Sequence, residues 1–342
     1  MIQRPQWIRR LSGQDRESAL RWSVVIAAPG GPAKEQWGDT WFARDLIDAL
    51  RRQGQRAKLV TRGGAEAPER ADDDVVLVLR GLRRVSPIRS GNTSRPQGTS
   101  RSQGTGRSQG TGRSRRTIWL LWVISHPDLV EEDEAGEFDA VFSASQHWSK
   151  APALGAVPLL QATNPARFNP GASMPDMGPE LLFVGSTRGG MRPIVRDALE
   201  AGLAPSVYGV GWDGLIDPAL ISGEFLPNED LPAAYASARV VLNDHWPDMA
   251  AEGFLSNRLF DACATGTRVI SDPAVGITDV FGDFVRVYDT SNELAELVGK
   301  QQSAFPDRPD RLAFADRIAQ EHSFDARATQ LIESVQQLRG SI

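Results

Sequence analysis

The chain of 342 residues is poor in the side chains from which many sites are built. Cys263 is its one cysteine, which excludes an intrachain disulfide and a cysteine-ligated zinc site, and four scattered histidines do not suggest a metal cage. The longest apolar run, residues 118–124, is far shorter than the ~20 residues of a membrane-spanning helix. The arginine-rich N-terminus lacks the apolar stretch of a signal peptide, so a cytoplasmic protein is expected.

Several nucleotide-binding signatures are also missing. The chain contains neither GxxxxGK[ST] nor GxGxxG, which counts against a P-loop ATPase and against a dehydrogenase. Its run of three aspartates, residues 72–74, precedes a predicted strand and so stands at the wrong end for a metal-dependent sugar transferase. We therefore expect no bound cofactor and no metal ligands.

Acidic residues are absent between Asp74 and Asp128, whereas ten arginines fall between Arg80 and Arg116. The whole chain has a net charge of -5, and without those arginines it keeps 28 basic residues against 43 acidic ones. An acidic body argues against nucleic acid as the main partner.

The basic segment contains the repeats RPQGTS, RSQGTG and RSQGTG, beginning at residue 95. Repeats of Gly, Ser, Thr, Gln and Arg cannot bury an apolar face, which predicts a disordered loop over about residues 86–116. The loop is interpreted as an expansion in a tolerant surface segment. The alternative is a basic tether that gives peripheral contact with an anionic membrane, or that binds nucleic acid.

The length suits two domains, and the pattern of the first, residues 1–165, alternates between strand and helix. An apolar strand at 22–28 is followed by a helix at 40–54, with apolar positions at three- and four-residue spacing and a glycine at its end. Further strands are predicted at 57–61, 74–79, 117–124, 140–143 and 157–160. Apolar strands that alternate with helices indicate a parallel sheet covered on both faces.

A proline-rich linker, residues 166–179, precedes a second alternation over residues 180–322. Its predicted strands are 181–186, 206–212, 238–244, 267–272 and 284–289, and its predicted helices are 191–201, 231–237 and one beginning near Ser256. The final segment, 323–342, contains an amphipathic helix that could cross back to the first domain. The fold class is therefore α/β, with two doubly wound Rossmann-like domains facing each other across a cleft.

The stretch AEGFLSNRLFDACATG concentrates polar residues at the start of a helix. Ser256 is a plausible N-cap, and Asn257 and Arg258 follow in the first turn, where backbone NH groups and a guanidinium together suit a diphosphate. Asp261 lies one turn further on and suits ribose hydroxyls. Glu252 precedes the helix and can point across the cleft.

This stretch resembles the nucleotide-sugar site of GT-B-fold glycosyltransferases. In the retaining group 1 enzymes (family 4-like), related to glycogen and sucrose-phosphate synthases, an acid and Gly-Phe precede a second acid, Ala and a Gly before a strand. The corresponding residues are Glu252-Gly253-Phe254, Asp261-Ala262 and Gly266. The SNRLFDA version is similar to the spore-maturation-protein-type branch. The resemblance implies that Glu252 acts on the sugar and Asp261 on the ribose.

Other stretches extend the resemblance. FVGSTRGG resembles the strand and glycine turn that open the second domain, which assigns Gly185 and Arg188 to the diphosphate. Residues 226–244 resemble a helix and strand of the same family, and the beginning of this stretch, residues 227–229 with Asn228, would lie near the base. In the first domain, Gly30 and Gly31 resemble a loop near phosphate or acceptor, although glycines there also serve the backbone of a strand-to-helix turn.

His126 follows the most apolar strand, at the rim where active-site groups gather. There it can bind the sugar or the diphosphate, or assist proton transfer with Asp128 nearby, and it is a catalytic candidate together with Glu252. The alternative is a capping turn in which Ser125 or Asp128 is structural.

The resemblance implies a retaining glycosyltransferase of hexosyltransferase type, and the absence of a suitably placed DxD indicates a metal-independent mechanism, in which Arg188, Arg258 and helix NH groups stabilise the diphosphate leaving group. Such an enzyme would move a sugar from a nucleoside-diphosphate sugar to a glycan, a lipid-linked acceptor or a small molecule. Two alternatives remain open: a non-catalytic nucleotide-sugar-binding or scaffold protein, and a sugar-nucleotide epimerase of GT-B architecture.

Overall fold

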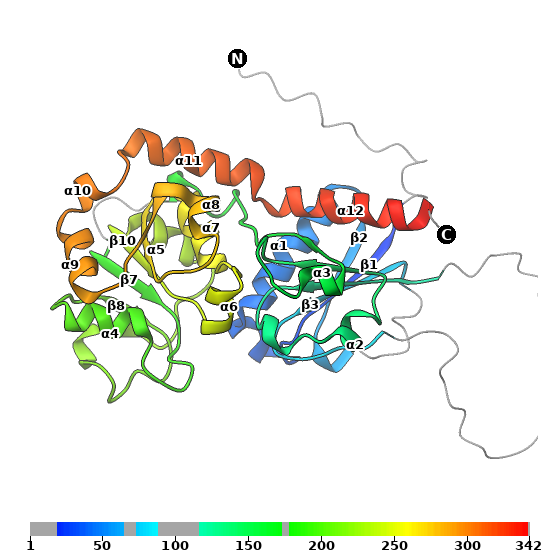
Figure 1. The fold of residues 1–342 in the computed structure, drawn as a ribbon, viewed down its shortest axis with the longest axis horizontal. Coiled ribbons are helices and arrows are strands. Elements are labelled where there is room, and N and C mark those ends of the chain that lie inside the picture. The colour runs from blue at the N-terminus through cyan, green and yellow to red at the C-terminus, as the bar shows by residue number, and fades with distance from the viewer. Residues whose placement is uncertain (1–18, 65–72, 88–115, 173–177, 341–342) are drawn as a thin grey trace, which may run out of the picture.

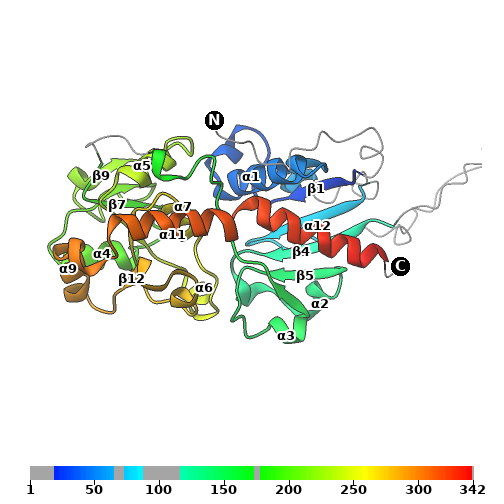
Figure 2. The same cartoon turned by 90° about the horizontal axis from the view of Figure 1, so that it is seen from above.

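The computed structural model describes residues 19–64, 73–87, 116–172 and 178–340, and nearly all of the predicted basic loop lies outside them. The described residues form two α/β domains that lie side by side, and a long helical segment at the C-terminal end runs along both (Figures 1 and 2). Within this part of the chain, no helix combines the length and the apolar character needed to cross a membrane.

The first domain contains a six-stranded sheet in the order β2-β1-β3-β4-β5-β6, and all its neighbouring strands pair in parallel. Its strands are β1 (Arg21–Val25), β2 (Arg56–Val60), β3 (Val75–Arg80), β4 (Ile118–Val123), β5 (Ala140–Ser143) and β6 (Ala156–Pro158). Every residue of β3 and β4 is buried, because these central strands are covered on both faces. This burial explains their continuous apolar sequences.

The second domain repeats the arrangement in the order β12-β11-β10-β7-β8-β9, again with parallel pairing throughout. Its strands are β7 (Leu181–Val184), β8 (Ser206–Tyr208), β9 (Ile221–Gly223), β10 (Val240–Asn243), β11 (Arg268–Ser271) and β12 (Val285–Val287). The predicted fold class, two doubly wound Rossmann-like domains, is confirmed.

The helices of the first domain are α1 (Gly38–Arg52), α2 (Glu132–Ala135) and α3 (Ala151–Leu154). Those that follow are α4 (Pro193–Glu200), α5 (Leu231–Ser237), α6 (Pro247–Ala251), α7 (Asn257–Ala264), α8 (Ile277–Phe281), α9 (Ser291–Gly299), α10 (Gln301–Ala304), α11 (Arg308–Glu321) and α12 (Phe324–Gly340). Helix α1 buries Phe42, Leu46 and Leu50 on one face, as its apolar spacing predicts. Gly54 follows its end with φ 84°, a left-handed conformation that favours glycine.

Helix α12 follows the second domain in sequence but packs on the first. It lies along α1 (Figure 1), and Phe324, Ala328 and Leu331 are buried in the same apolar cluster as the first sheet. The chain enters α12 beside the segment that leaves the first domain, where the Phe324 amide donates to the Thr163 carbonyl at 3.0 Å. Two adjacent crossings therefore join the domains.

Several elements were not predicted from the sequence, among them β9, α6, α8 and α11. β9 and α6 are three and five residues long, too short for a hydrophobic period to be visible. The predicted strand at 157–160 is instead the short β6, which ends at Pro158. Proline has no amide hydrogen to continue a ladder, and β6 pairs with a single neighbour at the sheet edge.

Candidate functional site

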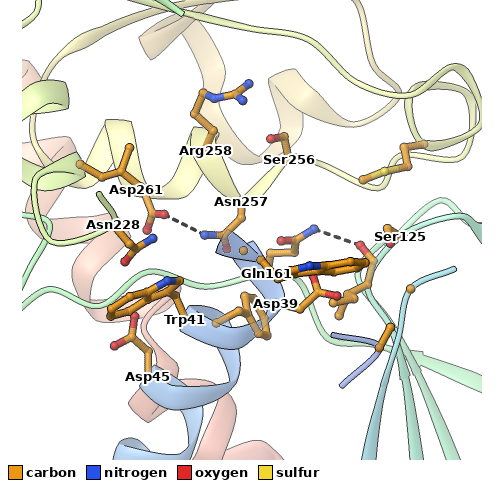
Figure 3. A pocket seen from close by; sticks show the side chains of 18 of the residues that line it. Asp39, Trp41, Asp45, Ser125, Gln161, Asn228, Ser256, Asn257, Arg258 and Asp261 are labelled. Carbon is orange, nitrogen blue, oxygen red and sulfur yellow. Dashed lines mark hydrogen bonds between the residues drawn. The ribbon is translucent and has the colours of Figure 1, made fainter. Parts of the chain in front are cut away.

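A cavity of about 590 Å³ opens between the two domains (Figure 3). The strand order reverses between β1 and β3 in the first sheet and between β7 and β10 in the second. Loops that follow these four strands line the cavity, with Trp37 and Gly81 on one side and Arg188 and Trp246 on the other. Open α/β sheets bind ligands at such reversal points, so this cavity is the candidate site.

The cavity gathers many of the residues singled out in the sequence. Those that line it are His126, Arg188, Asn228, Ser256, Asn257, Arg258 and Asp261. Four others do not line it: Gly30, Gly31, Gly185 and Glu252.

Arg188 lies at the cavity surface with a left-handed backbone, φ 59°, which is uncommon for a residue other than glycine. Its guanidinium lies over the ring of Trp246, 4.2 Å from the ring centre. Among the described residues, no carboxylate lies within ion-pair distance of it. Although the residue as a whole is exposed, burial of the guanidinium and repulsion from Arg192 and Arg258 lower the pKa of Arg188 to about 10. A cation held in this way favours an anionic ligand.

Arg192 supports the loop that carries Arg188. Its side chain is buried and pairs with the buried Asp244, with Nε donating to Oδ2 at 2.8 Å. It also donates to the Ser186 carbonyl at 2.9 Å. Arg192 is therefore neutralised by its ion pair with Asp244. The neighbouring Arg188 has no such ion pair among the described residues, and its charge faces the cavity.

Arg258 is engaged more fully than the sequence suggests. Its guanidinium donates to Asn243 Oδ1 at 3.0 Å and to the Val184 carbonyl, and it lies over the ring of Phe183. These contacts tie α7 to β7 and β10. Arg258 therefore lines the cavity while also holding the second domain together.

The start of α7 is oriented by a histidine and an aspartate. Ser256 occupies the N-cap position, but its side chain makes no capping hydrogen bond. Its backbone NH instead donates to His245 Nε2 at 3.0 Å, and His245 Nδ1 lies 2.6 Å from Asp272 Oδ1. This chain of contacts fixes the free NH groups of the first turn at the cavity wall.

Asp261 lies on the buried face of α7 and is 8% exposed. Its carboxyl oxygens accept hydrogen bonds from Thr163 Oγ1 and from Asn257 Nδ2, each at 2.8 Å. Burial raises the pKa of Asp261 to about 8, with a smaller contribution from the nearby Asp45. At neutral pH this group is therefore largely a neutral acid that can donate a hydrogen bond as well as accept one.

Asn228 lies at the far end of the cavity, beside Trp41 and Asp45 (Figure 3). Its side-chain oxygen and its carbonyl oxygen both accept hydrogen bonds from Arg167. Arg167 also pairs with Asp45 at 3.0 Å. This network joins α1, the interdomain segment and the loop before α5.

His126 lies on the first-domain side with a left-handed backbone, φ 51°. Its ring contacts Trp246, with 5.2 Å between ring centres, and its Nδ1 is 3.6 Å from Asp248 Oδ2. Burial lowers the pKa of His126 below its ordinary 6.5, so the imidazole is neutral at pH 7. His126, Asp128 and Asp248 place ligand atoms within 4.8 Å of one another, a spacing that a metal ion could use.

Comparisons with known proteins identify the fold. A family model described as "Glycosyl transferase-like" matches residues 190–333, and no curated protein matches the chain. AviGT4, a glycosyltransferase involved in avilamycin A biosynthesis, shares 18% identity over 94% of this chain and 99% of its own, with a TM-score of 0.58. The chain has the GT-B fold. It resembles GT-B glycosyltransferases of the group 1 type.

Two further structures of this fold contain ligands. The catalytic domain of starch synthase IV from Arabidopsis thaliana, bound to ADP and acarbose, shares 10% identity over 94% of this chain and 99% of its own, with a TM-score of 0.60. Anabaena HepE, in complex with UDP-glucose, shares 12% identity over 92% of this chain and 99% of its own, with a TM-score of 0.56. At these identities the likeness establishes the GT-B fold.

Glu252 differs most from the expectation drawn from the GT-B resemblance. Its carboxylate accepts hydrogen bonds from the backbone NH and the hydroxyl of Ser149, each at 2.7 Å, and so faces the first domain outside the cavity. The next residues complete the contact: Gly253 has φ 70°, and Phe254 packs edge-on against Trp148 in the first-domain core. In this arrangement the acid-Gly-Phe stretch anchors one domain to the other.

The three predicted glycines also lie outside the cavity lining. The Gly185 amide donates to the Tyr208 carbonyl at 2.7 Å, and an added Cβ would lie 3.2 Å from both Arg192 and the ring of Phe183. Close packing of the β7 and β8 loops explains this glycine. Gly30 and Gly31 are exposed in the turn before α1, where Gly31 has φ 74°, so the backbone of that turn explains them.

Among the cavity residues of this GT-B protein that were missed from the sequence are Trp246 and Asp39. Trp246 follows β10, and its ring contacts both Arg188 and His126. Asp39 stands in the first turn of α1 and lines the cavity. Its position shortly after the first apolar strand was the available signal, because ligands gather at the ends of such strands.

Proposed function

We propose that the protein is a glycosyltransferase that takes a sugar from a nucleoside-diphosphate sugar. The second domain would bind this sugar donor, and the first domain the acceptor. The glycosyl transferase-like family match, the GT-B fold and the ligands named for the ADP- and UDP-glucose-bound structures all support this reading.

The observation that carries the proposal is the cation at Arg188. Arg188, Arg192 and Arg258 gather around Asp244 and Asp272, which leaves more positive than negative charge beside the cavity. The NH groups at the start of α7 add partial positive charge to the same wall. A diphosphate leaving group would be bound and stabilised there without a metal ion.

Other residues take roles that follow from their contacts. Asp261 and Asn257 would bind the ribose, and Asn228 would lie toward the base. His126, as a neutral imidazole, would hydrogen-bond the sugar. The resemblance to retaining enzymes favours retention of the anomeric configuration.

The test is thermal unfolding of the wild type and of Arg188→Gln with UDP, GDP, ADP and TDP. A ligand at about 100 times its Kd stabilises the folded protein by about 2.7 kcal/mol, and loss of a hydrogen bond to a charged group costs about 1.5–3 kcal/mol. We expect one nucleotide to stabilise the wild type, and its affinity to fall roughly 10- to 100-fold in Arg188→Gln.

Arg196→Gln is the matched control, because Arg196 is exposed on α4 and paired with Asp197. Equal affinity in Arg188→Gln and in the control contradicts the proposed diphosphate site. Mass analysis of the products from the selected nucleotide sugar then separates transfer from the alternatives. A transferase gives a glycosylated acceptor, and a binding protein leaves the sugar nucleotide intact. An epimerase gives a sugar of changed configuration without any acceptor.

A further inference from the structure

A carboxyl group faces the cavity from the first domain without a protein partner. Asp39 lies in the first turn of α1 on the same side of the cavity as Ser125 and Gln161, and Asn257 and Arg258 lie opposite (Figure 3). The residue is half-buried, and this burial raises the pKa of its carboxyl above the ordinary 3.8 of an aspartate. Among the described residues, no side chain forms a hydrogen bond or an ion pair with it.

The other two aspartates in the cavity lining have protein hydrogen-bond partners. Asp261 accepts hydrogen bonds from Thr163 and Asn257, and Asp45 is bound by Asn164 and Arg167. Withdrawing even part of a carboxyl from water without giving it a protein partner costs free energy, which calls for an explanation. A ligand that supplies the missing hydrogen bonds is one.

Gly81 leaves space next to this carboxyl. An added Cβ at Gly81 would lie 3.7 Å from Asp39 Oδ2 and 3.5 Å from Ser125 Oγ. Asp39 Oδ2 and Ser125 Oγ therefore lie on either side of a space that a side chain at position 81 would fill. A ligand group above Gly81 can reach both a carboxylate, which accepts, and a hydroxyl, which accepts and donates.

The neighbouring surface suits a ring that carries hydroxyl groups. Two exposed apolar side chains line the cavity here. Trp37, two residues before Asp39, is 38% exposed, and Leu82, next to Gly81, is 58% exposed. Apolar faces of this kind pack against the C–H groups of a ring, while Asp39 and Ser125 take its hydroxyls. An ammonium ligand fits less well, because five arginines and three aspartates line the cavity.

We propose that Asp39 binds a hydroxyl group of the acceptor, and that the acceptor is a polyhydroxylated ring, a sugar or a cyclitol, seated over Gly81 between Asp39, Ser125 and Trp37. This inference rests on the proposed glycosyl transfer and adds the class of acceptor and the residue that selects it.

The experiment compares Asp39→Asn with wild type, using the nucleotide sugar whose nucleotide stabilises the protein. Probe acceptors are glucose, mannose, galactose and myo-inositol, each free and as a monophosphate, and hydrolysis of the nucleotide sugar is followed in parallel. We expect transfer to at least one probe by wild type, with an acceptor KM at least roughly tenfold higher in Asp39→Asn. Nucleotide affinity should stay within about twofold of wild type, because the proposed diphosphate contacts lie on the second domain.

Asp48→Asn is the matched control, since Asp48 lies on the same helix but is exposed outside the cavity. The unfolding temperature of Asp39→Asn should equal or exceed that of wild type, because the substitution removes a half-buried carboxyl that has no protein partner. A lower unfolding temperature would indicate a structural role and overturn the inference.

The inference is also overturned if Asp39→Asn transfers to a probe as well as the control does. It fails too if wild type hydrolyses the nucleotide sugar yet glycosylates none of the ring probes. If wild type neither binds a nucleoside diphosphate nor consumes any nucleotide sugar, the proposed function has failed, and the acceptor role falls with it.

Discussion

Two arginines in the cavity differ in how much of the fold depends on them. The Arg188 guanidinium lies over the face of the Trp246 ring and lines the cavity. Arg258 lines the same cavity but donates hydrogen bonds to Asn243 and to the Val184 carbonyl. A substitution at Arg188 should therefore affect ligand binding with little effect on stability, whereas a substitution at Arg258 should affect both.

Arg258→Ala is expected to lower the free energy of unfolding by about 2–3 kcal/mol in the absence of ligand, because it leaves partly buried oxygens without their donor. Arg188→Gln should change it by less than about 0.5 kcal/mol. Urea unfolding of both variants measures the difference. Equal stability of the two would contradict the structural role of Arg258.

Asp261 makes stability depend on pH in a direction opposite to that of a salt-bridged aspartate. Its pKa is 3.8 in an ordinary setting and about 8 in the folded protein. The folded state therefore binds this proton more tightly than the unfolded state. The resulting stabilisation is fully present below about pH 3.8 and is lost as the pH rises through about 8.

Asp261→Asn cannot ionise and should remove this part of the pH dependence. Between about pH 5 and about pH 8, its free energy of unfolding should fall less than that of wild type. Urea unfolding at the two pH values tests this, with the exposed Asp213→Asn as control. A variant whose stability falls as steeply as that of wild type would show that Asp261 is ionised in the folded protein.

At the scale of elements, the segment from α6 to the start of α7 connects the two domains. Met249 and Phe254 belong to an apolar cluster of the first domain, although they follow β10 of the second. Gly253 permits the close approach, because an added Cβ would lie 3.0 Å from both Ser145 Oγ and the Val275 carbonyl. The Glu252 carboxylate completes the contact on Ser149.

Phe254→Ala should destabilise the protein by about 3–5 kcal/mol, the usual cost of removing a buried phenylalanine. It should also loosen the domains and expose the interdomain segment to proteolysis. Phe225→Ala, at a side chain that is 48% exposed, is the control. Unfolding by urea and limited proteolysis report the two effects, and a variant as stable as the control would rule out the anchor.

At the scale of the whole molecule, α12 makes the first domain depend on the end of the chain. Its buried residues share the core that α1 and the first sheet form. Arg52 on α1 adds an ion pair with Asp325 at 2.9 Å. The first domain is therefore complete once the chain has passed through the second and returned.

Leu331→Ala should cost about 2–5 kcal/mol of unfolding free energy, although residue 331 lies far beyond the first domain in sequence. The exposed Glu333→Ala, two residues further along the same helix, is the control. Circular dichroism during urea unfolding gives the comparison. Equal midpoints for the two variants would mean that α12 contributes little to that core.

Much of the fold was predictable, because its signals are local. The runs at β3 and β4 are apolar throughout since both faces of a central parallel strand are buried. The three- and four-residue spacing of α1 likewise reports the single face that it buries. Short elements such as β9 and α6 were missed because three to five residues do not show a period.

The candidate site was predictable where a residue's place after a strand decides its surroundings. His126, Arg188 and the start of α7 all reach the cavity for this reason. Their roles in binding and transfer stay predictions. Glu252 points to the first domain, as expected, but it does not line the cavity, because its carboxylate binds Ser149, about a hundred residues earlier in the chain.

The sequence by itself determined the two alternating patterns, hence two parallel sheets whose strand ends carry the polar residues. The tertiary structure alone decided which of those residues share one cavity, that α12 packs on α1, and that Asp39 has no partner among the described residues. The physical reason is range: hydrophobic periodicity arises within one element, whereas burial, pairing and pKa depend on contacts between segments distant in the chain.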